Sequence, residues 1–161
     1  YKLLSTELKS QYPLVLSGKK GWLLEEIEKT LQPMLDSGEV IWLGYLNSKD
    51  LPALYSSATA FTYVSHFEGF GMPIAEAMAC GTAVIASDNT AMKEASGGAV
   101  CIVSPHSIGS IAQGMRKVLL DSSYRIECET KGLEISKNRS WKVSKQLLVT
   151  ALSNLNNGAQ I

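Results

Sequence analysis

Short apolar runs alternate with helical patterns along most of this chain, and this alternation restricts the folds that the chain can adopt. The five runs cover residues 14–16, 40–43, 60–64, 83–86 and 100–103, and Gly, Ser, Pro or Asn bounds them. Such runs are typical of strands buried on both faces of a parallel sheet. Strands that alternate with helices form right-handed βαβ units. We therefore predict an α/β fold, a doubly wound parallel sheet with helices on both faces.

The helical patterns have recognisable beginnings and ends. An apolar residue recurs at every fourth position at Leu23, Ile27, Leu31 and Leu35. A later helix has Pro73 near its first position and stops before Gly81, which favours a helix end. The pattern of residues 1–11 predicts the C-terminal part of a helix that begins before residue 1. Residues 47–50 are a predicted N-terminal cap for the helix that follows them. Beyond residue 107 the pattern is helical, then polar, then helical again over 141–155.

Composition limits the classes of partner. The chain of 161 residues is 45% hydrophobic, enough for one core, and 15 basic residues balance 15 acidic ones. Because the net charge is zero, the chain has no broad electrostatic field that would attract nucleic acid or an anionic membrane, so we expect neither as a partner. No apolar run approaches the length of a transmembrane helix, and the first residues lack the features of a signal peptide. The three cysteines lack metal-like spacing, which favours free thiols in a reducing cytoplasm and no metal site.

In a doubly wound sheet, ligands bind where the carboxyl ends of the strands lead into helices. The first such loop holds Gly18, Lys19 and Lys20. Glycine lets the backbone approach a ligand, and two lysines bring the positive charge that a diphosphate needs. A solvated turn with exposed lysines explains the same residues equally well. The string GKKGW does not complete the phosphate loop GxxxxGK[ST].

The second loop follows the expected strand at 40–43 and contains Tyr45. Its ring could face a nucleobase, but aromatic side chains pack more often than they bind, so we favour packing against the sheet edge. The backbone of this loop is a candidate border of a base-binding site.

The third loop carries the most specific pattern in the chain. Glu68 and Glu76 stand eight positions apart around a turn and a helix start, formed by Gly69, Phe70, Gly71 and Met72. The first amides of a helix lack internal partners and carry the positive end of its dipole, so a phosphate is favoured there. Carboxylates accept hydrogen bonds from sugar hydroxyls. Glu68 is thus a candidate for the hexose of a nucleotide sugar, and Glu76 for its ribose.

A purely structural explanation competes for each glutamate. Glu76 would offset the helix dipole by about 0.3–1 kcal/mol without any ligand, and Glu68 would be a loop glutamate in water. Apolar sequence neighbours predict that Glu76 is buried, which would leave its carboxylate in need of a donor such as a ligand hydroxyl. His66 is more often a hydrogen-bonded loop residue than a base, so no chemistry is assigned to it.

The segment EGFGMPIAEAMACGTAVIAS resembles the donor-site signature of the retaining family 4 glycosyltransferases, which have two facing Rossmann-like domains, the GT-B fold. Glu68 and Glu76 match the paired glutamates of that signature. The preceding segment VIWLGYLNSKDLPALYSSATAFTYVS and the following GGAVCIV resemble the same family, and SGKKGW resembles the glycine loop of bacterial mannosyltransferase-like members. The resemblance covers about residues 14–141. It implies that residues 1–161 are one Rossmann-like nucleotide-sugar-binding domain, the C-terminal part of such an enzyme.

The resemblance also implies roles for individual residues. Glu68 matches the glutamate that approaches the donor hexose and is usually called catalytic, and Glu76 matches the glutamate that binds the ribose. Backbone amides that bind sugar hydroxyls and phosphate are matched by Gly69, Phe70, Gly71 and Met72. The family works without a metal, and no Asp-x-Asp motif is present in the chain. We therefore expect a nucleotide-diphosphate sugar as substrate and no cofactor.

Two parts of the family's pattern do not occur within these 161 residues. They are the Arg and Lys that hold the diphosphate and the N-terminal domain that binds the acceptor. The resemblance implies transfer of a hexose, with mannose favoured, to a glycan or lipid-linked acceptor bound by the missing domain. It places the protein in the cytoplasm, or peripherally at the inner membrane through that domain.

We expect the 161 residues alone to bind nucleotide diphosphate weakly and to transfer no sugar. Three alternatives stay open: a donor-binding subunit that needs a separate acceptor-domain chain, a nucleotide-sugar epimerase or phosphorylase of the same fold, and a non-catalytic nucleotide-sugar-binding module.

Overall fold

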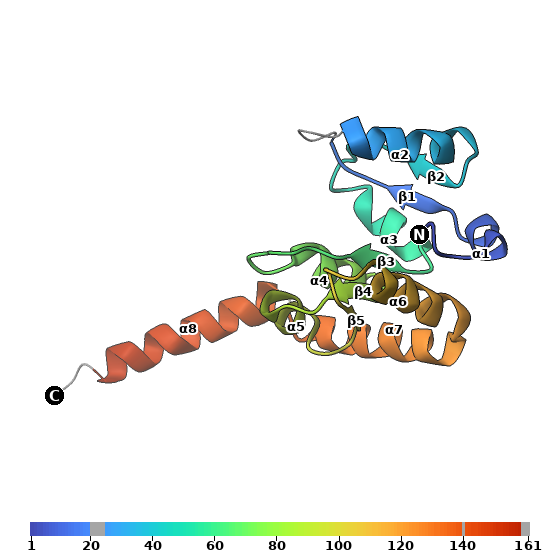
Figure 1. The fold of residues 1–161 in the computed structure, drawn as a ribbon. Coiled ribbons are helices and arrows are strands. Elements are labelled where there is room, and N and C mark those ends of the chain that lie inside the picture. The colour runs from blue at the N-terminus through green and yellow to red at the C-terminus, as the bar shows by residue number, and fades with distance from the viewer. Residues whose placement is uncertain (20–24, 140, 159–161) are drawn as a thin grey trace.

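The computed structural model describes residues 1–19, 25–139 and 141–158, and within them five strands alternate with helices (Figure 1). The strands are β1 (Leu14–Leu16), β2 (Val40–Trp42), β3 (Phe61–Tyr63), β4 (Val84–Ser87) and β5 (Cys101–Val103). The helices are α1 (Thr6–Gln11), α2 (Glu25–Asp36), α3 (Leu51–Ser57), α4 (Met72–Ala79), α5 (Thr90–Ser96), α6 (Ile108–Leu120), α7 (Ser122–Lys137) and α8 (Trp141–Gly158). Each expected strand is present and every pairing is parallel, so the predicted α/β fold is confirmed.

The strands form two sheets, where one continuous sheet was expected. β1 pairs with β2, with Leu14 opposite Val40, and β4 lies between β3 and β5, with Ile85 opposite Cys101. In the described part of the chain no strand joins β1 to β3. Figure 1 shows the smaller sheet, together with α2, set apart from the larger one.

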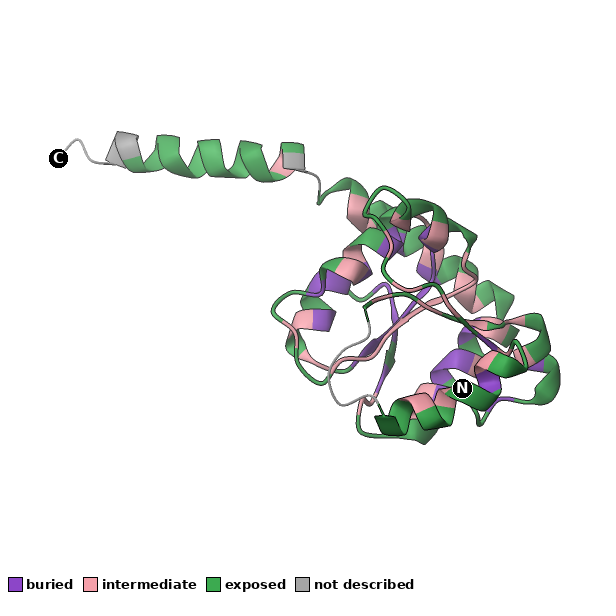
Figure 2. Cartoon of the chain, turned by 90° about the horizontal axis from the view of Figure 1, so that it is seen from above, coloured by how far each residue is buried: buried purple, intermediate pink, exposed green. Residues whose placement is uncertain are grey.

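The core lies on both faces of β4, whose four residues are all buried. Ala83 and Ile85 belong to a cluster with side chains of α1, α6 and α7. Val84 and Ala86 belong to a second cluster with side chains of α3, α4 and α5. This division follows from the two-residue period of a strand. The single core expected from composition is therefore two clusters, one on each face of the larger sheet (Figure 2).

Three helices differ from expectation. α1 begins after Ser5, whose hydroxyl accepts a hydrogen bond from the Leu8 amide (3.4 Å), so no helix is under way at Tyr1. Asp50 precedes α3 but makes no side-chain capping bond. The stretch after residue 121, which the sequence pattern described only as polar, is the helix α7.

The sequence pattern did not reveal α7 because this helix packs against α4 through a close approach of the two backbones. A Cβ on Gly132 would come within 3.2 Å of Met78 Cγ on α4, so the missing side chain lets the two helices meet. Only Cys128 and Gly132 of α7 are buried. So small a buried face leaves no apolar stripe for a sequence pattern to detect.

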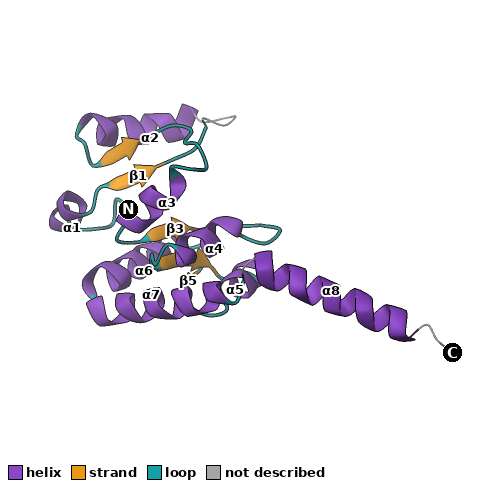
Figure 3. Ribbon diagram, turned by 180° about the vertical axis from the view of Figure 1, so that it is seen from behind, coloured by secondary structure: helices purple, strands orange, loops and turns teal. Residues whose placement is uncertain are grey.

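α8 leaves the body of the domain (Figure 3). Its apolar side chains are exposed. Leu147 is 66% exposed and Leu155 is 70% exposed. No helix among the described residues is long and apolar enough to cross a membrane.

Candidate functional site

The loops after β1 and β2 are hydrogen-bonded to each other. The Gly18 amide donates to the Gly44 carbonyl (2.8 Å), and the Trp42 indole N–H donates to the Gly18 carbonyl (3.4 Å). Gly18, Lys19 and Tyr45 line one cavity of about 490 Å³. Three of the candidate residues therefore line one cavity, and Lys20 lies outside the described residues.

Tyr45 corrects the expectation of packing. Its side chain is 68% exposed, and the Lys19 ammonium lies 5.0 Å from the centroid of its ring. A cation over an aromatic face is attracted by the ring quadrupole. The tyrosine is thus held at the surface by Lys19, with its ring available to a ligand, rather than buried at the sheet edge.

Glu68 is anchored by two hydroxyl groups from the end of β3. Tyr63 donates to Glu68 Oε1 at 2.6 Å, and Ser65 donates to the same oxygen at 2.9 Å. Tyr63 and Ser65 are two positions apart, so they lie on the same side of an extended segment. The second carboxylate oxygen of Glu68 is not used by either bond.

These bonds set the ionisation of the pair. The hydrogen bonds from Tyr63, first, and from Ser65 lower the pKa of Glu68 below its ordinary value. Burial of the Tyr63 ring, followed by the bond to Glu68 and the charge of that carboxylate, raises the pKa of Tyr63 to about 12. At neutral pH the pair therefore consists of a carboxylate and an intact phenol.

Glu76 is exposed, so the predicted burial of this carboxylate is wrong. Ile74, Ala77 and Met78 of the same helix are buried, but successive helical residues point about 100° apart, which turns Glu76 away from them. The Tyr55 hydroxyl donates to Glu76 Oε2 at 3.3 Å. Apolar neighbours in sequence are therefore not neighbours in space here, and the carboxylate does not need a ligand for its stability.

An aromatic cluster connects the anchors of the two glutamates. Tyr55 packs edge-on against Phe61 with ring centroids 5.1 Å apart, and Phe61 stacks on Tyr63 at 5.8 Å. Burial and, next, the charge of Glu76 raise the pKa of Tyr55 to about 12. Sequence analysis did not identify these tyrosines. The alternation of Tyr63 and Ser65 before Glu68 was the available signal for one of them, and no sequence signal pointed to Tyr55.

Gly71 forms the entry to α4. It has φ 86° and ψ 45°, a left-handed conformation, and a Cβ there would lie 3.2 Å from Met92 Sδ. Gly69 differs, because its φ is not in the left-handed region and a Cβ would have nothing within 4 Å. Only the second glycine of the motif is therefore required by the backbone. Phe70 and Met72, on either side of Gly71, are exposed.

The loop is also fixed from β4 and α5, which sequence analysis missed. Ser87 and Asn89 donate to the Ser65 carbonyl at 2.6 and 3.2 Å, respectively. Asn89 also accepts a hydrogen bond from the Met92 amide (2.9 Å) and so caps α5. An Asn before a helical pattern was the usable signal for the cap, but nothing in the sequence indicated its bond to Ser65.

No metal centre is evident in the part of the chain that the structure describes, where no group of three His, Cys, Asp or Glu could hold an ion. His66 packs against His106 with ring centroids 4.7 Å apart and the ring planes tilted by 36°. Cys80, Cys101 and Cys128 carry free thiols.

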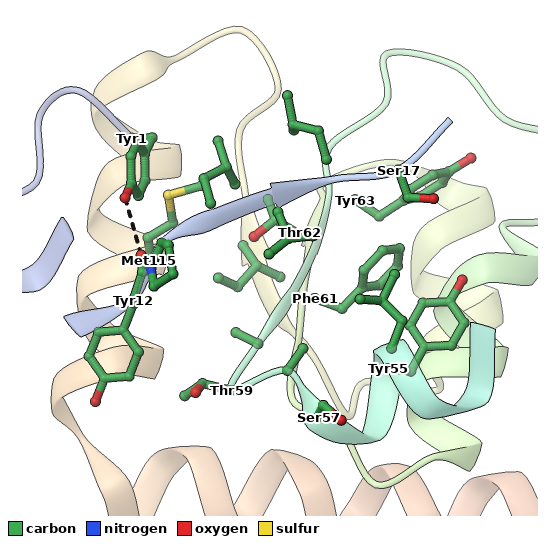
Figure 4. A pocket seen from close by; sticks show the side chains of 18 of the residues that line it. Tyr1, Tyr12, Ser17, Tyr55, Ser57, Thr59, Phe61, Thr62, Tyr63 and Met115 are labelled. Atoms are coloured by element: carbon green, nitrogen blue, oxygen red, sulfur yellow. Dashed lines mark hydrogen bonds between the residues drawn. The ribbon is translucent and has the colours of Figure 1, made fainter. Parts of the chain in front are cut away.

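A second cavity lies between β1 and β3, and a neighbour of each candidate loop lines it (Figure 4). Ser17, just before Gly18, lines it on the β1 side, and Tyr63, the anchor of Glu68, lines it on the β3 side. The carboxyl ends of β1 and β3 thus bring both candidate loops to one edge of the domain.

Comparison with known proteins identifies relatives among transferases. The family profile described as glycosyl transferases group 1 matches residues 1–134. The chain is 37% identical over 142 residues to O-antigen chain mannosyltransferase B of Escherichia coli, an alignment that covers 88% of this chain and 37% of that protein. It is 33% identical over 164 residues to the serotype-specific mannosyltransferase WbdA of E. coli, over 99% of this chain and 20% of that protein. The chain thus spans about two fifths or less of the length of these relatives.

Solved structures have the same fold. Sucrose-phosphate synthase from Thermosynechococcus elongatus has a TM-score of 0.78 at 24% identity, over 91% of this chain and 39% of that chain. Anabaena HepE, in complex with UDP and glucose, has a TM-score of 0.71 at 21% identity, over 91% of this chain and 43% of that chain. At these identities the likeness supports the fold alone, whereas the profile supports the family. The chain therefore belongs to the group 1 glycosyl transferases, carries their C-terminal domain, and has bacterial mannosyltransferases among its relatives.

Proposed function

We propose that residues 1–161 are the donor-binding domain of a retaining transferase that moves a hexose, with mannose favoured, from a nucleotide-diphosphate sugar to a glycan or lipid-linked acceptor. The observation that carries the proposal is the ionised Glu68 carboxylate, held by Tyr63 and Ser65 just before the left-handed turn into α4. Membership of the group 1 family and the mannosyltransferase names of two relatives support it.

The start of α4 suits the diphosphate. Gly71 and Met72 stand at the start of the helix, so the carbonyls four residues before them are not part of the helix and cannot accept from their amides. Pro73 has no N–H. The Ile74 amide already donates to the Gly71 carbonyl at 3.0 Å. Free amides and the positive end of the helix dipole therefore meet at Gly71 and Met72, where a phosphate oxygen gains most.

Glu68 suits the sugar. As the bond between the sugar and the diphosphate breaks, positive charge develops on the sugar and negative charge on the leaving group. A carboxylate with a lowered pKa remains ionised at neutral pH, so it stabilises the positive charge on the sugar and accepts hydrogen bonds from the sugar hydroxyls. The same ionisation argues against Glu68 as a proton donor. We therefore assign it to holding and stabilising the hexose.

The remaining residues extend the site along the donor. We assign Glu76, which accepts a hydrogen bond from Tyr55, to the ribose, because it lies one turn into the helix whose start would hold the phosphates. Gly18, Lys19 and Tyr45 border a cavity that we assign to the nucleotide, with Lys20 beside them in sequence. The acceptor would bind on the N-terminal domain of the whole protein.

Calorimetry of the 161-residue chain with GDP-mannose, UDP-glucose and ADP-glucose tests the proposal. We expect weak binding of one of them, and no sugar transfer by this chain alone. Replacing a carboxylate that accepts a hydroxyl removes a charged hydrogen bond, so Glu76→Gln should weaken binding by roughly 10- to 100-fold. Glu134→Gln, at an exposed position on α7, is the matched control and should not change it. Absence of binding by all three donors would contradict the assignment, and measurable turnover would contradict the predicted inactivity.

Two further properties follow from the same assignment. Because amides and lysines neutralise the diphosphate, donor binding should survive removal of divalent ions with EDTA, and its loss would show that a metal is needed. The proposed donors, nucleotide sugars, are metabolites of the cytoplasm, so we place the whole protein in the cytoplasm or peripherally at the inner membrane. Cell fractionation of the whole protein tests this location.

The alternative is a donor-binding subunit that requires a separate acceptor-domain chain, or a module that binds nucleotide sugar without catalysis. Purification of the natural protein distinguishes them. A single longer polypeptide that transfers sugar supports the proposal. A stable partner chain supports the subunit, and binding without transfer by the natural protein supports the module.

A further inference from the structure

The backbone of residues 66–70 makes no hydrogen bond within the described part of the chain. The two ends of this loop are fixed, because the Ser65 carbonyl accepts hydrogen bonds from β4 and from the cap of α5, and Gly71 forms the turn into α4. Between these ends lie Glu68 and the unpaired amides of the candidate site. Unpaired amides are open to a ligand, but they do not hold the loop in place.

The side chains of the loop provide only local support, with one exception. Phe67 is 88% exposed and Phe70 is 41% exposed, so neither ring anchors the loop in the core. Tyr63 and Ser65 donate to Glu68, but they lie only five and three positions before it. Their bonds fold the loop back on the end of its own strand and do not join it to another element.

The exception is the contact between His66 and His106. The two ring centroids are 4.7 Å apart and the ring planes are tilted by 36°, a separation at which aromatic rings attract each other. His106 follows β5, which lies on the far side of β4 from β3. Among the hydrogen bonds, ion pairs and ring contacts of the described residues, this contact alone ties residues 66–70 to an element other than their own strand.

The turn that carries His106 is itself fixed. The Ser104 amide donates to the Ser110 hydroxyl (3.0 Å), and the Ser107 amide donates to the Ser104 carbonyl (3.2 Å). Ser107 also caps α6, because its hydroxyl accepts from the Ser110 amide (3.2 Å). His106 therefore stands on a held backbone and offers His66 a stationary surface.

We propose that His106 is a positioning residue of the candidate site, which acts through His66 to fix the loop of residues 66–70. Its effect on the donor rests on the proposed function, in which Glu68 holds the hexose. A loop that is ordered before the ligand arrives loses less conformational entropy on binding. His106 thus raises donor affinity through the loop, whereas the contact between the rings exists with or without a nucleotide sugar.

NMR relaxation of backbone amide nitrogens, measured without a donor, tests whether His106 holds the loop. We expect an order parameter above about 0.8 for Gly69 in the unchanged chain and below about 0.6 in His106→Ala. His106→Phe keeps a ring against His66 and should restore the order. Ile108→Ala is the matched control, because Ile108 is 73% exposed and lies two positions from His106. It should leave the order of Gly69 unchanged.

Calorimetry with GDP-mannose, UDP-glucose and ADP-glucose tests the consequence for the site. The donor that binds to the unchanged chain should bind to His106→Ala roughly 2- to 10-fold more weakly, the range expected for the loss of one aromatic pair. His106→Phe should restore the affinity. His66→Ala should weaken binding by a similar factor, and the double Ala variant should weaken it no further, because the two residues form one contact.

Two further measurements separate positioning from a general structural role. Both histidines are exposed, so His106→Ala should leave Tm unchanged. It should also leave the lowered pKa of Glu68 unchanged in carboxyl NMR, because the bonds from Tyr63 and Ser65 that cause it are local. A residue that positions the loop changes its order and the donor affinity alone.

Several results would overturn the proposal. Gly69 that stays ordered in His106→Ala, or that loses order equally in Ile108→Ala, would show that the ring contact does not hold the loop. Lost order with unchanged donor affinity would show that the loop needs no positioning, and a fall in Tm in His106→Ala would show a structural role. If none of the three donors binds to the unchanged chain, the proposed function fails, and the order of Gly69 still decides whether His106 holds the loop.

Discussion

Replacement of Gly71 by alanine tests whether the turn into α4 depends on a left-handed residue. At φ 86° and ψ 45° an L-residue destabilises the folded state by about 1–2 kcal/mol. Alanine also lowers the conformational entropy of the unfolded chain, which stabilises the folded state by about 0.4–1 kcal/mol. The added Cβ would lie 3.2 Å from Met92 Sδ and 3.6 Å from Ala95 Cβ, and both side chains are buried. Crowding of this kind adds up to about 1–3 kcal/mol when neighbours cannot move. We expect a net destabilisation of about 1–3 kcal/mol.

Urea unfolding followed by circular dichroism measures this change. The midpoint should fall at an unchanged slope, and Tm should fall by roughly 2–10 °C. Gly69→Ala is the matched control, two residues away in the same loop, where the backbone is not left-handed and nothing lies within 4 Å of the new Cβ. It should leave stability unchanged or raise it slightly. Equal losses in the two variants would refute the argument, because they would show that the loop needs flexibility rather than one left-handed residue.

Other predictions concern the groups around the two glutamates. Tyr63→Phe should raise the pKa of Glu68 towards its ordinary value, as followed by carboxyl NMR, and more than Ser65→Ala does, because the tyrosine is the larger cause of the lowered pKa. Tyr63 and Tyr55 have pKa values raised to about 12 by the fold, so the folded state holds their protons more tightly than the unfolded state. The contribution of these two tyrosines to stability should therefore be constant below pH about 10 and be lost as pH rises to about 12, and the double Phe variant should flatten that alkaline decline in urea unfolding. Asn89→Ala removes the cap of α5 and one of two donors to the Ser65 carbonyl, so it should cost about 1–2 kcal/mol in the same assay; a change within error would show that Ser87 suffices.

The strand positions could be predicted because each strand is an apolar run bounded by turn residues, and such a pattern depends only on local sequence. The break between β1 and β3 could not be predicted in this way. Pairing between strands is a tertiary property, and a single strand does not show which neighbour it lacks. α7 was missed for a related reason, since it packs through Cys128 and Gly132, which give no amphipathic pattern.

The candidate loop was identified from its glutamates and glycines, whose types and spacing carry chemistry. Errors arose where a neighbour in sequence was taken for a neighbour in space. Glu76 follows buried residues in its helix but points away from them. The error at Tyr45 had a different cause, the general preference of aromatic side chains for packing: its ring is 68% exposed and lies beside the Lys19 ammonium of another loop.

The structure also explains why the spacing of the two glutamates is insufficient by itself to form a site. Glu68 is only half-buried and Glu76 is exposed, so burial does not position either carboxylate. Each is positioned by a tyrosine hydroxyl, Glu68 by Tyr63 of β3 and Glu76 by Tyr55 of α3. The rings of these tyrosines both contact Phe61, and that aromatic cluster packs beside the buried β4. The relative position of the two acidic groups is therefore set by α3 and β3, which precede the signature, as much as by the eight-residue interval within it. A chain with the same glutamates but without these aromatic residues would keep the motif and lose the fixed geometry on which the proposed recognition of both ends of a donor depends.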